Sequence, residues 1–199
     1  MAASTEGHAV VAVPTNPFDG QKPGTSGLRK KTTVFQQEHY LENFIQSTFT
    51  ALGDSVVGAT LVAAGDGRFF SRPVLQTIVK MAAANGVSRV WVPQHGIMAT
   101  PAVSAVIRER EDGVAAGGFI LTASHNPGGP DADFGVKYNM SNGGPAPGSV
   151  TDSIHEATAA IDSYSTVPDL PEVDLDTLGS HTFLLAGGRE FVVEVIPQS

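Results

Sequence analysis

The sequence contains no cysteine, and its 12 lysine and arginine residues are outnumbered by 20 aspartate and glutamate residues, which gives a net charge of −8. The lack of cysteine excludes a disulfide scaffold, a thiolate zinc site and a cysteine nucleophile, and it fits a reducing compartment. The acidic balance argues against nucleic acid as a partner, because binding to a phosphate backbone needs a basic face.

Long apolar runs are also missing. No stretch approaches the ~20 apolar residues of a membrane span, so no membrane partner is expected. Residues 1–20 contain neither lysine nor arginine. They therefore differ from the basic start of a secretory signal and from an arginine-rich transit peptide. We expect a cytoplasmic protein.

Apolar residues nevertheless make up 41% of the 199 residues, which is enough for one substantial core. The 22 glycine and 13 proline residues predict many tight turns between short elements. We expect a short N-terminal strand and loop over 1–19, followed by one domain over 20–195.

Apolar periodicity predicts strands that alternate with amphipathic helices. The expected strands are 8–13, 32–36, 59–66, 89–93, 117–123 and 134–140. The expected helices are 41–52, one beginning near Ser71, one beginning at Thr100–Pro101, and roughly 151–163. After Tyr164 the pattern weakens. The alternation predicts an α/β fold, with a mixed, largely parallel sheet covered by helices.

Ligands of such sheets collect where loops leave the carboxyl ends of strands. Two polar segments fall at such ends, GDGR at 65–68 and TASHNPGG at 122–129. We expect GDGR to order its own loop, with Asp66 in an ion pair or a cap. The acidic segments DADF (131–134) and VDLD (173–176) lack the third acid and the glycine of a metal loop, which favours solvated loops.

The serine loop allows three interpretations. A hydrolase pair of Ser124 and His125 is disfavoured, because neighbours on an extended chain face opposite sides and the G-x-S-x-G elbow is missing. The loop could also simply satisfy its own backbone in turns. In the third interpretation Ser124 carries a phosphate, with a charge of about −1.5 to −2. That phosphate needs a metal ion or cations such as Arg29 and Lys137. Loop chemistry alone leaves the choice open.

Each cation also has a plain structural interpretation. Arg29 fits a solvated basic run with Lys30 and Lys31. Lys137 alternates with apolar neighbours and fits an exposed position on a strand. His95 and His181 have no partner at the spacing of metal ligands.

Four segments together resemble a known family. They are KPGTSGLRKK (22–31), GDGR (65–68), NGVSRVWVPQHGIMATPAVS (85–104) and TASHNPGGPDADFGVKYNMSNGGPAP (122–147). In this order and spacing they resemble the first domain of phosphoglucomutases in the α-D-phosphohexomutase superfamily, and most closely the plant-type cytosolic enzymes. The resemblance implies the three-layer α/β/α domain I of that superfamily.

The resemblance implies that Ser124 is the serine phosphorylated in the active enzyme. Its phosphoryl group would pass to glucose 1-phosphate or glucose 6-phosphate through bound glucose 1,6-bisphosphate. The implied cofactor is Mg²⁺, which would contact the phosphate on Ser124. The implied partners are sugar phosphates.

Further roles follow from the same resemblance. Arg29 and Lys137 are expected beside the transferring phosphate, and Thr25 and Ser26 in the phosphate-binding segment. His125 is expected to take part in catalysis. A positioned set of cations suits phosphoryl transfer, which needs little covalent help.

The family pattern is not complete in this sequence. The D-G-D-x-D-R magnesium loop and the later sugar-binding and phosphate-binding loops of the family are not found in it. We expect the later domains to be absent and turnover by this chain alone to be small or nil. The surface that they would cover is expected to allow association, and the oligomeric state is open. The alternative function is a non-catalytic interaction protein that keeps the fold.

Overall fold

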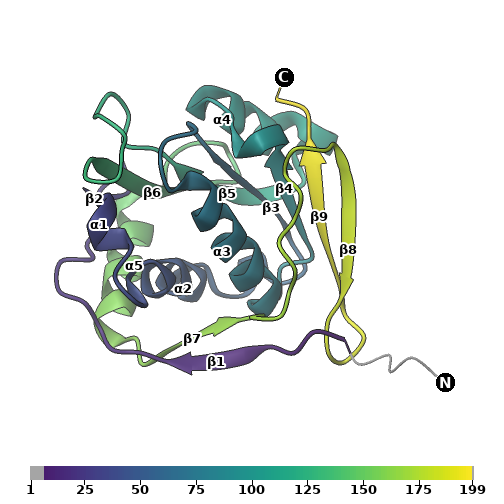
Figure 1. Cartoon of the computed structure of the whole chain (residues 1–199), viewed down its shortest axis with the longest axis horizontal. Helices are drawn as coiled ribbons and strands as arrows, with labels where there is room; N and C mark the ends of the chain where they lie inside the picture. Colours follow the sequence, from purple (N-terminus) through teal and green to yellow (C-terminus); the bar gives the residue numbers. More distant parts are fainter. Residues whose placement is uncertain (1–6, 199) are drawn as a thin grey trace.

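A seven-stranded sheet crosses the computed structural model, which describes residues 7–198 (Figure 1). Its strands are β2 (Leu28–Lys31), β3 (Thr60–Gly65), β4 (Arg89–Pro93), β5 (Ala115–Leu121), β6 (Asp133–Met140), β8 (Gly179–Leu184) and β9 (Glu190–Ile196). The spatial order is β2-β6-β5-β3-β4-β9-β8. The four central strands β5, β3, β4 and β9 are parallel, and β6, β2 and β8 pair antiparallel with their neighbours. The sheet is therefore mixed, with a parallel centre.

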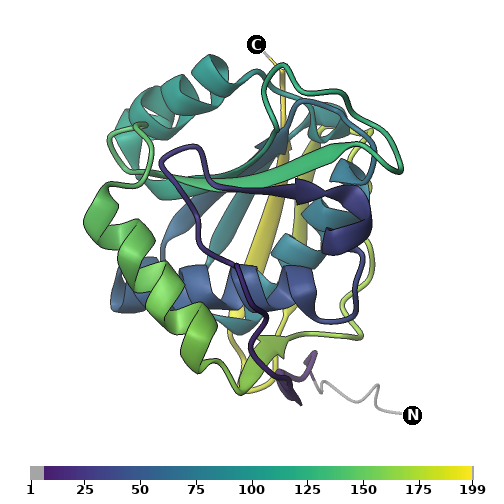
Figure 2. The ribbon, with the colours of Figure 1, turned by 90° about the vertical axis from the view of Figure 1, so that its left-hand side faces the viewer.

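Helices cover both faces of this sheet (Figures 1 and 2). They are α1 (Thr32–Phe35), α2 (Tyr40–Leu52), α3 (Ser71–Ala84), α4 (Thr100–Glu109) and α5 (Gly148–Ala160), with short 3₁₀ turns at Gly53–Val56, Gln94–Gly96 and Arg110–Gly113. Helices α2, α3 and α5 contribute to one core cluster, and α4 packs into a second cluster on the opposite face. The expected three-layer α/β/α architecture is confirmed.

Strand β3 shows why the sheet is buried on both faces. Leu61 and Ala63 belong to the larger core cluster, whereas Val62 and Ala64 belong to the cluster under α4. Successive side chains of a strand point to opposite faces, so an uninterrupted apolar run suits a strand between two helical layers.

The first expected strand lies outside the main sheet. β1 (Val11–Pro14) pairs antiparallel with β7 (Ser163–Thr166) in a separate two-stranded ribbon, which runs along the lower edge in Figure 1. The boundary expected between 1–19 and 20–195 stays a prediction.

The strand expected over 32–36 is wrong. Residues 28–31 form β2 instead, and the chain turns into α1 at Thr32. The Thr32 hydroxyl donates hydrogen bonds to the carbonyls of Gly129 and Ala132, which holds this turn against the serine loop. Tertiary contacts thus override the β propensity of two threonines and a valine.

The weakened pattern after Tyr164 conceals β7 and a terminal hairpin. The Gly187–Gly188 turn joins β8 to β9, and β9 pairs parallel with β4, about a hundred residues upstream. Phe191, Val193 and Val195 are buried, and this period-two pattern was the available signal. No helix within residues 7–198 is long and apolar enough to cross a membrane.

Candidate functional site

The site lies past the carboxyl ends of two neighbouring strands. β3 ends at Gly65 and leads into Asp66–Arg68, and β5 ends at Leu121 and leads into the serine loop, defined here as residues 122–132. Parallel pairing of β3 with β5 brings Gly65 opposite Leu121. Two segments far apart in sequence therefore meet at the carboxyl-terminal ends of the central strands, the usual position for a ligand in such a sheet.

Arg29 and Lys137 reach these strand ends from β2 and β6. Arg29 pairs with Gly135 in the antiparallel register, and Lys137 is two residues further along the same strand. Both cations therefore project from one face of the sheet, while Phe134, at a position of opposite parity, is buried in the core. A Cβ atom at Gly135 would lie 2.3 Å from the Thr122 carbonyl oxygen, so only glycine allows the serine loop to approach here.

The Ser124 side chain is exposed, and its Oγ accepts a hydrogen bond of 2.8 Å from Arg29 Nη2. The backbone of Ser124 is left-handed, with φ of 55°. This conformation costs a non-glycine residue roughly 1–2 kcal/mol. Such strain persists only where surrounding contacts impose it, and it concentrates at functional sites. The exposed hydroxyl next to a guanidinium agrees with the phosphate-bearing interpretation, and Arg29 is more than part of a solvated basic run.

Lys137 is half-buried rather than fully exposed on its strand. Burial and, secondly, the positive charge of Arg29 lower the pKa of the Lys137 ammonium below its ordinary value. Both causes disfavour the charged form. A dianion bound between the two side chains would offset the repulsion between their charges.

Thr25 and Ser26 are the exposed central residues of a tight turn. Gly24 and Gly27 exchange backbone hydrogen bonds of 3.2 and 2.9 Å across it. Gly27 has φ of 82°, and a Cβ atom there would lie 2.4 Å from the Lys137 Cβ. The turn therefore packs directly against β6 beside Lys137, which brings the predicted phosphate-binding segment to the predicted cations.

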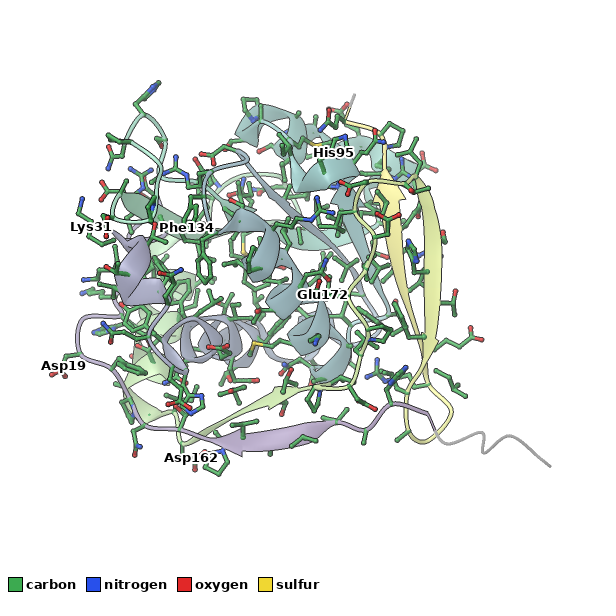
Figure 3. All side chains as sticks on the ribbon, in the orientation of Figure 1. Asp19, Lys31, His95, Phe134, Asp162 and Glu172 are labelled. Atoms are coloured by element: carbon green, nitrogen blue, oxygen red, sulfur yellow. The ribbon has the colours of Figure 1, made fainter. Side chains whose placement is uncertain are left out.

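His125 is exposed next to Ser124. The following part of the loop is fixed by Asp133, whose carboxylate accepts a hydrogen bond of 2.8 Å from Asn126 and pairs with Lys31 at 2.7 Å. The Lys31 hydrogen bond is the main reason that the pKa of Asp133 is lowered. Figure 3 shows Lys31 directed outward, whereas Phe134 lies within the fold.

Sequence reasoning missed two contributors to the site, Arg68 and Thr122. Arg68 donates hydrogen bonds to the carbonyls of Ser124 and Asp133, and Thr122 accepts one from the Ser124 N–H. Asp66 pairs with Arg68, as the GDGR segment predicted. Burial tends to raise the pKa of Asp66, but hydrogen bonds from Arg68 and Thr122 hold it below its ordinary value. In the sequence, these residues could have been found as the polar positions that directly follow the two strands.

The described residues do not by themselves fit a magnesium centre. Within 7–198, no three or more His, Cys, Asp or Glu side chains are placed to hold a metal ion. The carboxylates of Asp66 and Asp133 are paired with Arg68 and Lys31. A hard divalent cation prefers about six oxygen ligands, and phosphorylated Ser124 would offer only phosphate oxygens.

One aspartate of each acidic segment also has a side-chain partner. Asp133 of DADF is bound as described above, and Asp176 of VDLD accepts a forked pair of hydrogen bonds from Arg72, with His95 Nδ1 at 2.8 Å. Asp176 remains exposed, as expected of a solvated loop, whereas Asp133 is half-buried. Both segments serve to fasten the chain, and neither supplies a metal loop.

The layers and strand ends define an α/β/α domain that presents a serine hydroxyl among cations. The family model described as "Phosphoglucomutase/phosphomannomutase, alpha/beta/alpha domain I" matches residues 20–165, and the chain belongs to this family. The resemblance to phosphoglucomutases is thereby confirmed.

Curated relatives and a solved structure agree with this assignment. The chain is 65% identical over 173 residues to "Phosphoglucomutase, cytoplasmic 1" of Zea mays, covering 85% of this chain and 30% of that protein. It is 60% identical over 190 residues to "Probable phosphoglucomutase, cytoplasmic 2" of Arabidopsis thaliana, covering 94% of this chain and 32% of that protein. The open form of pp63/parafusin, a phosphoglucomutase from Paramecium, superposes with a TM-score of 0.92 at 43% identity, covering 98% of this chain and 36% of that one. The chain spans about a third of the length of these relatives.

Proposed function

We propose that this chain is the serine-bearing domain of a cytoplasmic phosphoglucomutase, which interconverts glucose 1-phosphate and glucose 6-phosphate. In this proposal Ser124 Oγ accepts a phosphoryl group from glucose 1,6-bisphosphate and returns it to a glucose monophosphate. The single observation that carries the proposal is the exposed Ser124 hydroxyl at 2.8 Å from Arg29 Nη2.

The proposed step forms a bond between Ser124 Oγ and phosphorus while the bond from phosphorus to the sugar oxygen breaks. Arg29 holds the hydroxyl and, with further N–H donors, can bind the equatorial oxygens of the phosphoryl group. The serine proton is proposed to pass to the neutral amine form of Lys137, which a lowered pKa favours, and to reach the sugar oxygen as its bond to phosphorus breaks; Lys137 then carries its charge beside the phosphate, and His125 is the second candidate for this proton transfer.

Thr25 and Ser26 are proposed to bind the phosphate through their hydroxyls or amides, beside Lys137. Mg²⁺ belongs to the proposal as the family's cofactor, and it would supply charge neutralisation at the phosphate. On this chain its proposed ligand is the phosphate of Ser124. Its other ligands have to come from outside residues 7–198 or from water.

The test is the intact mass of the folded chain after incubation with glucose 1,6-bisphosphate and Mg²⁺. We expect a gain of one phosphoryl group, mapped to Ser124 by fragmentation and lost in Ser124→Ala. Ser153→Ala, an exposed serine on α5, is the matched control and should keep the gain. An unchanged mass in a folded sample, or a phosphate that persists in Ser124→Ala, contradicts the proposal. The first of these outcomes favours the non-catalytic interaction protein.

A further inference from the structure

Both backbone polar groups of Ser124 are hydrogen-bonded to side chains, one within the serine loop and one from the loop after β3. The Ser124 N–H donates to Thr122 Oγ1 at 2.9 Å, and the Ser124 carbonyl accepts from Arg68 Nη2 at 3.3 Å. The residue with the left-handed backbone is thus held on both of its peptide groups, while its hydroxyl stays free to meet Arg29.

The two side chains are joined to each other through Asp66. Thr122 Oγ1 donates to Asp66 Oδ2 at 2.7 Å, and the same oxygen accepts from Arg68 Nη2 at 2.8 Å. Hydrogen bonds therefore form a closed circuit from the Ser124 N–H through Thr122, Asp66 and Arg68 to the Ser124 carbonyl. Because each member orients the next, a change at any one of them releases the others.

We infer that Asp66, Arg68 and Thr122 form a serine clamp that fixes the backbone of Ser124 and thereby aims its hydroxyl at Arg29. These three are positioning residues, since they contact the Ser124 backbone and not the reacting oxygen. The catalytic consequence of the clamp rests on the proposed function, whereas its effect on the Ser124 backbone does not.

The donors of Arg68 argue against a direct role in binding phosphate. Nε and Nη2 are directed to Asp66, Nη2 is shared with the Ser124 carbonyl, and Nη1 donates to the Asp133 carbonyl at 2.7 Å. The Arg68 side chain is only 7% exposed. Among residues 7–198, Arg29 makes one side-chain hydrogen bond, to Ser124, and so keeps donors for an anion. Arg68 thus binds the backbone of the serine loop, whereas Arg29 is available to bind a phosphate.

The bond from Arg68 to Asp133 extends the clamp to the far end of the serine loop, where β6 begins. A single guanidinium therefore holds the loop at both ends. Its charge is balanced by Asp66, so the clamp adds no net charge beside the hydroxyl that would carry a dianion. The clamp therefore fixes the position of Ser124 and leaves Arg29 and Lys137 as the cations beside its hydroxyl.

The test compares Thr122→Val, which keeps the shape but removes the hydroxyl, with Thr122→Ser, which restores it. Thr158→Val is the matched control, because Thr158 is also buried and its hydroxyl donates to the backbone, away from the serine loop. The first readout is hydrogen exchange of the Ser124 amide in the full chain, followed by NMR. The second readout is the rate of phosphate uptake from glucose 1,6-bisphosphate, measured at several donor concentrations.

We expect exchange of the Ser124 amide to rise about fivefold in Thr122→Val, the effect of one lost hydrogen bond. Thr122→Ser and Thr158→Val should exchange like the wild type. The maximal rate of phosphate uptake should fall by a similar or larger factor in Thr122→Val, at a nearly unchanged half-saturating concentration. Unchanged exchange in Thr122→Val, or equal loss in Thr122→Val and Thr122→Ser, overturns the clamp.

Arg68→Lys is the second variant, used if Thr122→Val does not fold. It keeps a charge beside Asp66 but loses the planar fork, so the same rise in exchange and fall in maximal rate are expected. Wild-type behaviour of Arg68→Lys in both readouts overturns the clamp. Should the wild type take up no phosphate, the proposed function fails, and the exchange comparison alone then decides the clamp.

Discussion

Two aspartate–arginine pairs lie past the ends of neighbouring parallel strands, yet they serve different purposes. Asp66 and Arg68 follow β3, whereas Asp176 joins Arg72 at the start of α3 and His95 just after β4. Both arginines engage their carboxylate through two nitrogens. The side chains of Arg68 and Asp66 are 7% and 31% exposed, whereas those of Arg72 and Asp176 are 50% and 51% exposed.

The surroundings explain what each pair does. Arg68 has donors left for two backbone carbonyls, so its ion pair positions the serine loop. Arg72 lies in the first turn of α3, where the helix dipole disfavours a cation and no acidic residue is present. Asp176 supplies that missing negative charge from a distant loop and so fastens the loop to the helix. In Figure 3, His95 marks this second cluster near the upper edge.

Burial is therefore what separates the two clusters. Removing one partner of a buried pair leaves an uncompensated charge and unpaired polar groups, which costs several kcal/mol. An exposed pair exchanges its partner for water at little cost. The same two residue types can thus hold a site rigid in one place and merely restrain a loop in another.

The largest expected effect comes from Arg68→Met, compared with Arg72→Met. Arg68→Met removes the counter-charge of the Asp66 carboxylate and the donors to two carbonyls, so we expect the free energy of unfolding to fall by about 2–3 kcal/mol. This corresponds to a decrease in Tm of about 5–10 °C for a chain of this size. Arg72→Met should lower Tm far less. Thermal unfolding followed by circular dichroism measures both variants.

Methionine keeps the apolar stem of each arginine, so lost packing does not dominate either result. The double variant Asp66→Asn/Arg68→Met serves as the control, and it should recover part of the loss because no carboxylate is left unpaired. Equal losses in Arg68→Met and Arg72→Met contradict the distinction drawn from burial.

Much of the fold was predictable because its central elements carry strong local patterns. The apolar runs of β3 and β5 and the stripes of α2 and α3 are long and regular, and the structure confirms them. The errors fall where pairing is distant in sequence. Residues 32–36 read as a strand locally, but they are turned into a helix by contacts to the serine loop a hundred residues away. The pairing of β9 with β4 is equally remote.

The candidate site also contains a part that the sequence predicts and a part that arises only on folding. Ser124 and its cations follow from a contiguous loop and from the resemblance. The link from Thr122 through Asp66 to Arg68 joins two strand ends that are only adjacent after folding. The sequence pattern put both segments at strand ends but could not pair a particular hydroxyl with a particular carboxylate.

Acid is expected to weaken both pairs, and each for its own reason. The pKa values of Asp66 and Asp176 are both lowered from 3.8. For Asp66, hydrogen bonds from Arg68 and Thr122 outweigh burial, and for Asp176 the Arg72 hydrogen bond is the main cause. A lowered carboxyl pKa stabilises the fold above the unfolded value, and the contribution is lost as pH falls through the folded value. We therefore expect stability to fall with pH below 3.8.

Urea unfolding between pH 2 and pH 7 measures this loss, over a range of about five pH units centred on the carboxyl titration. Asp66→Asn and Asp176→Asn should each be less stable than the wild type at neutral pH and show a flatter decline in acid. Glu190→Gln, at an exposed position on β9, is the control and should keep the wild-type slope. A wild-type slope in both aspartate variants contradicts the ion-pair assignments.

Salt gives the smallest expected effect and the finest comparison of the two pairs. The screening length is about 3 Å in 1 M salt. The attraction between exposed charges is therefore lost at high salt, whereas the attraction between buried charges is largely kept. The difference in stability between Arg72→Met and the wild type should shrink toward zero from about 0.05 M to 1 M sodium chloride. The difference for Arg68→Met should persist, because its main part is the loss of the hydrogen bonds from the largely buried Arg68 guanidinium to the carbonyls of Ser124 and Asp133. Urea unfolding measures both, since urea carries no charge. A loss of the Arg68→Met effect at high salt would mean that Arg68 acts as a surface charge and that the serine loop is held by something else.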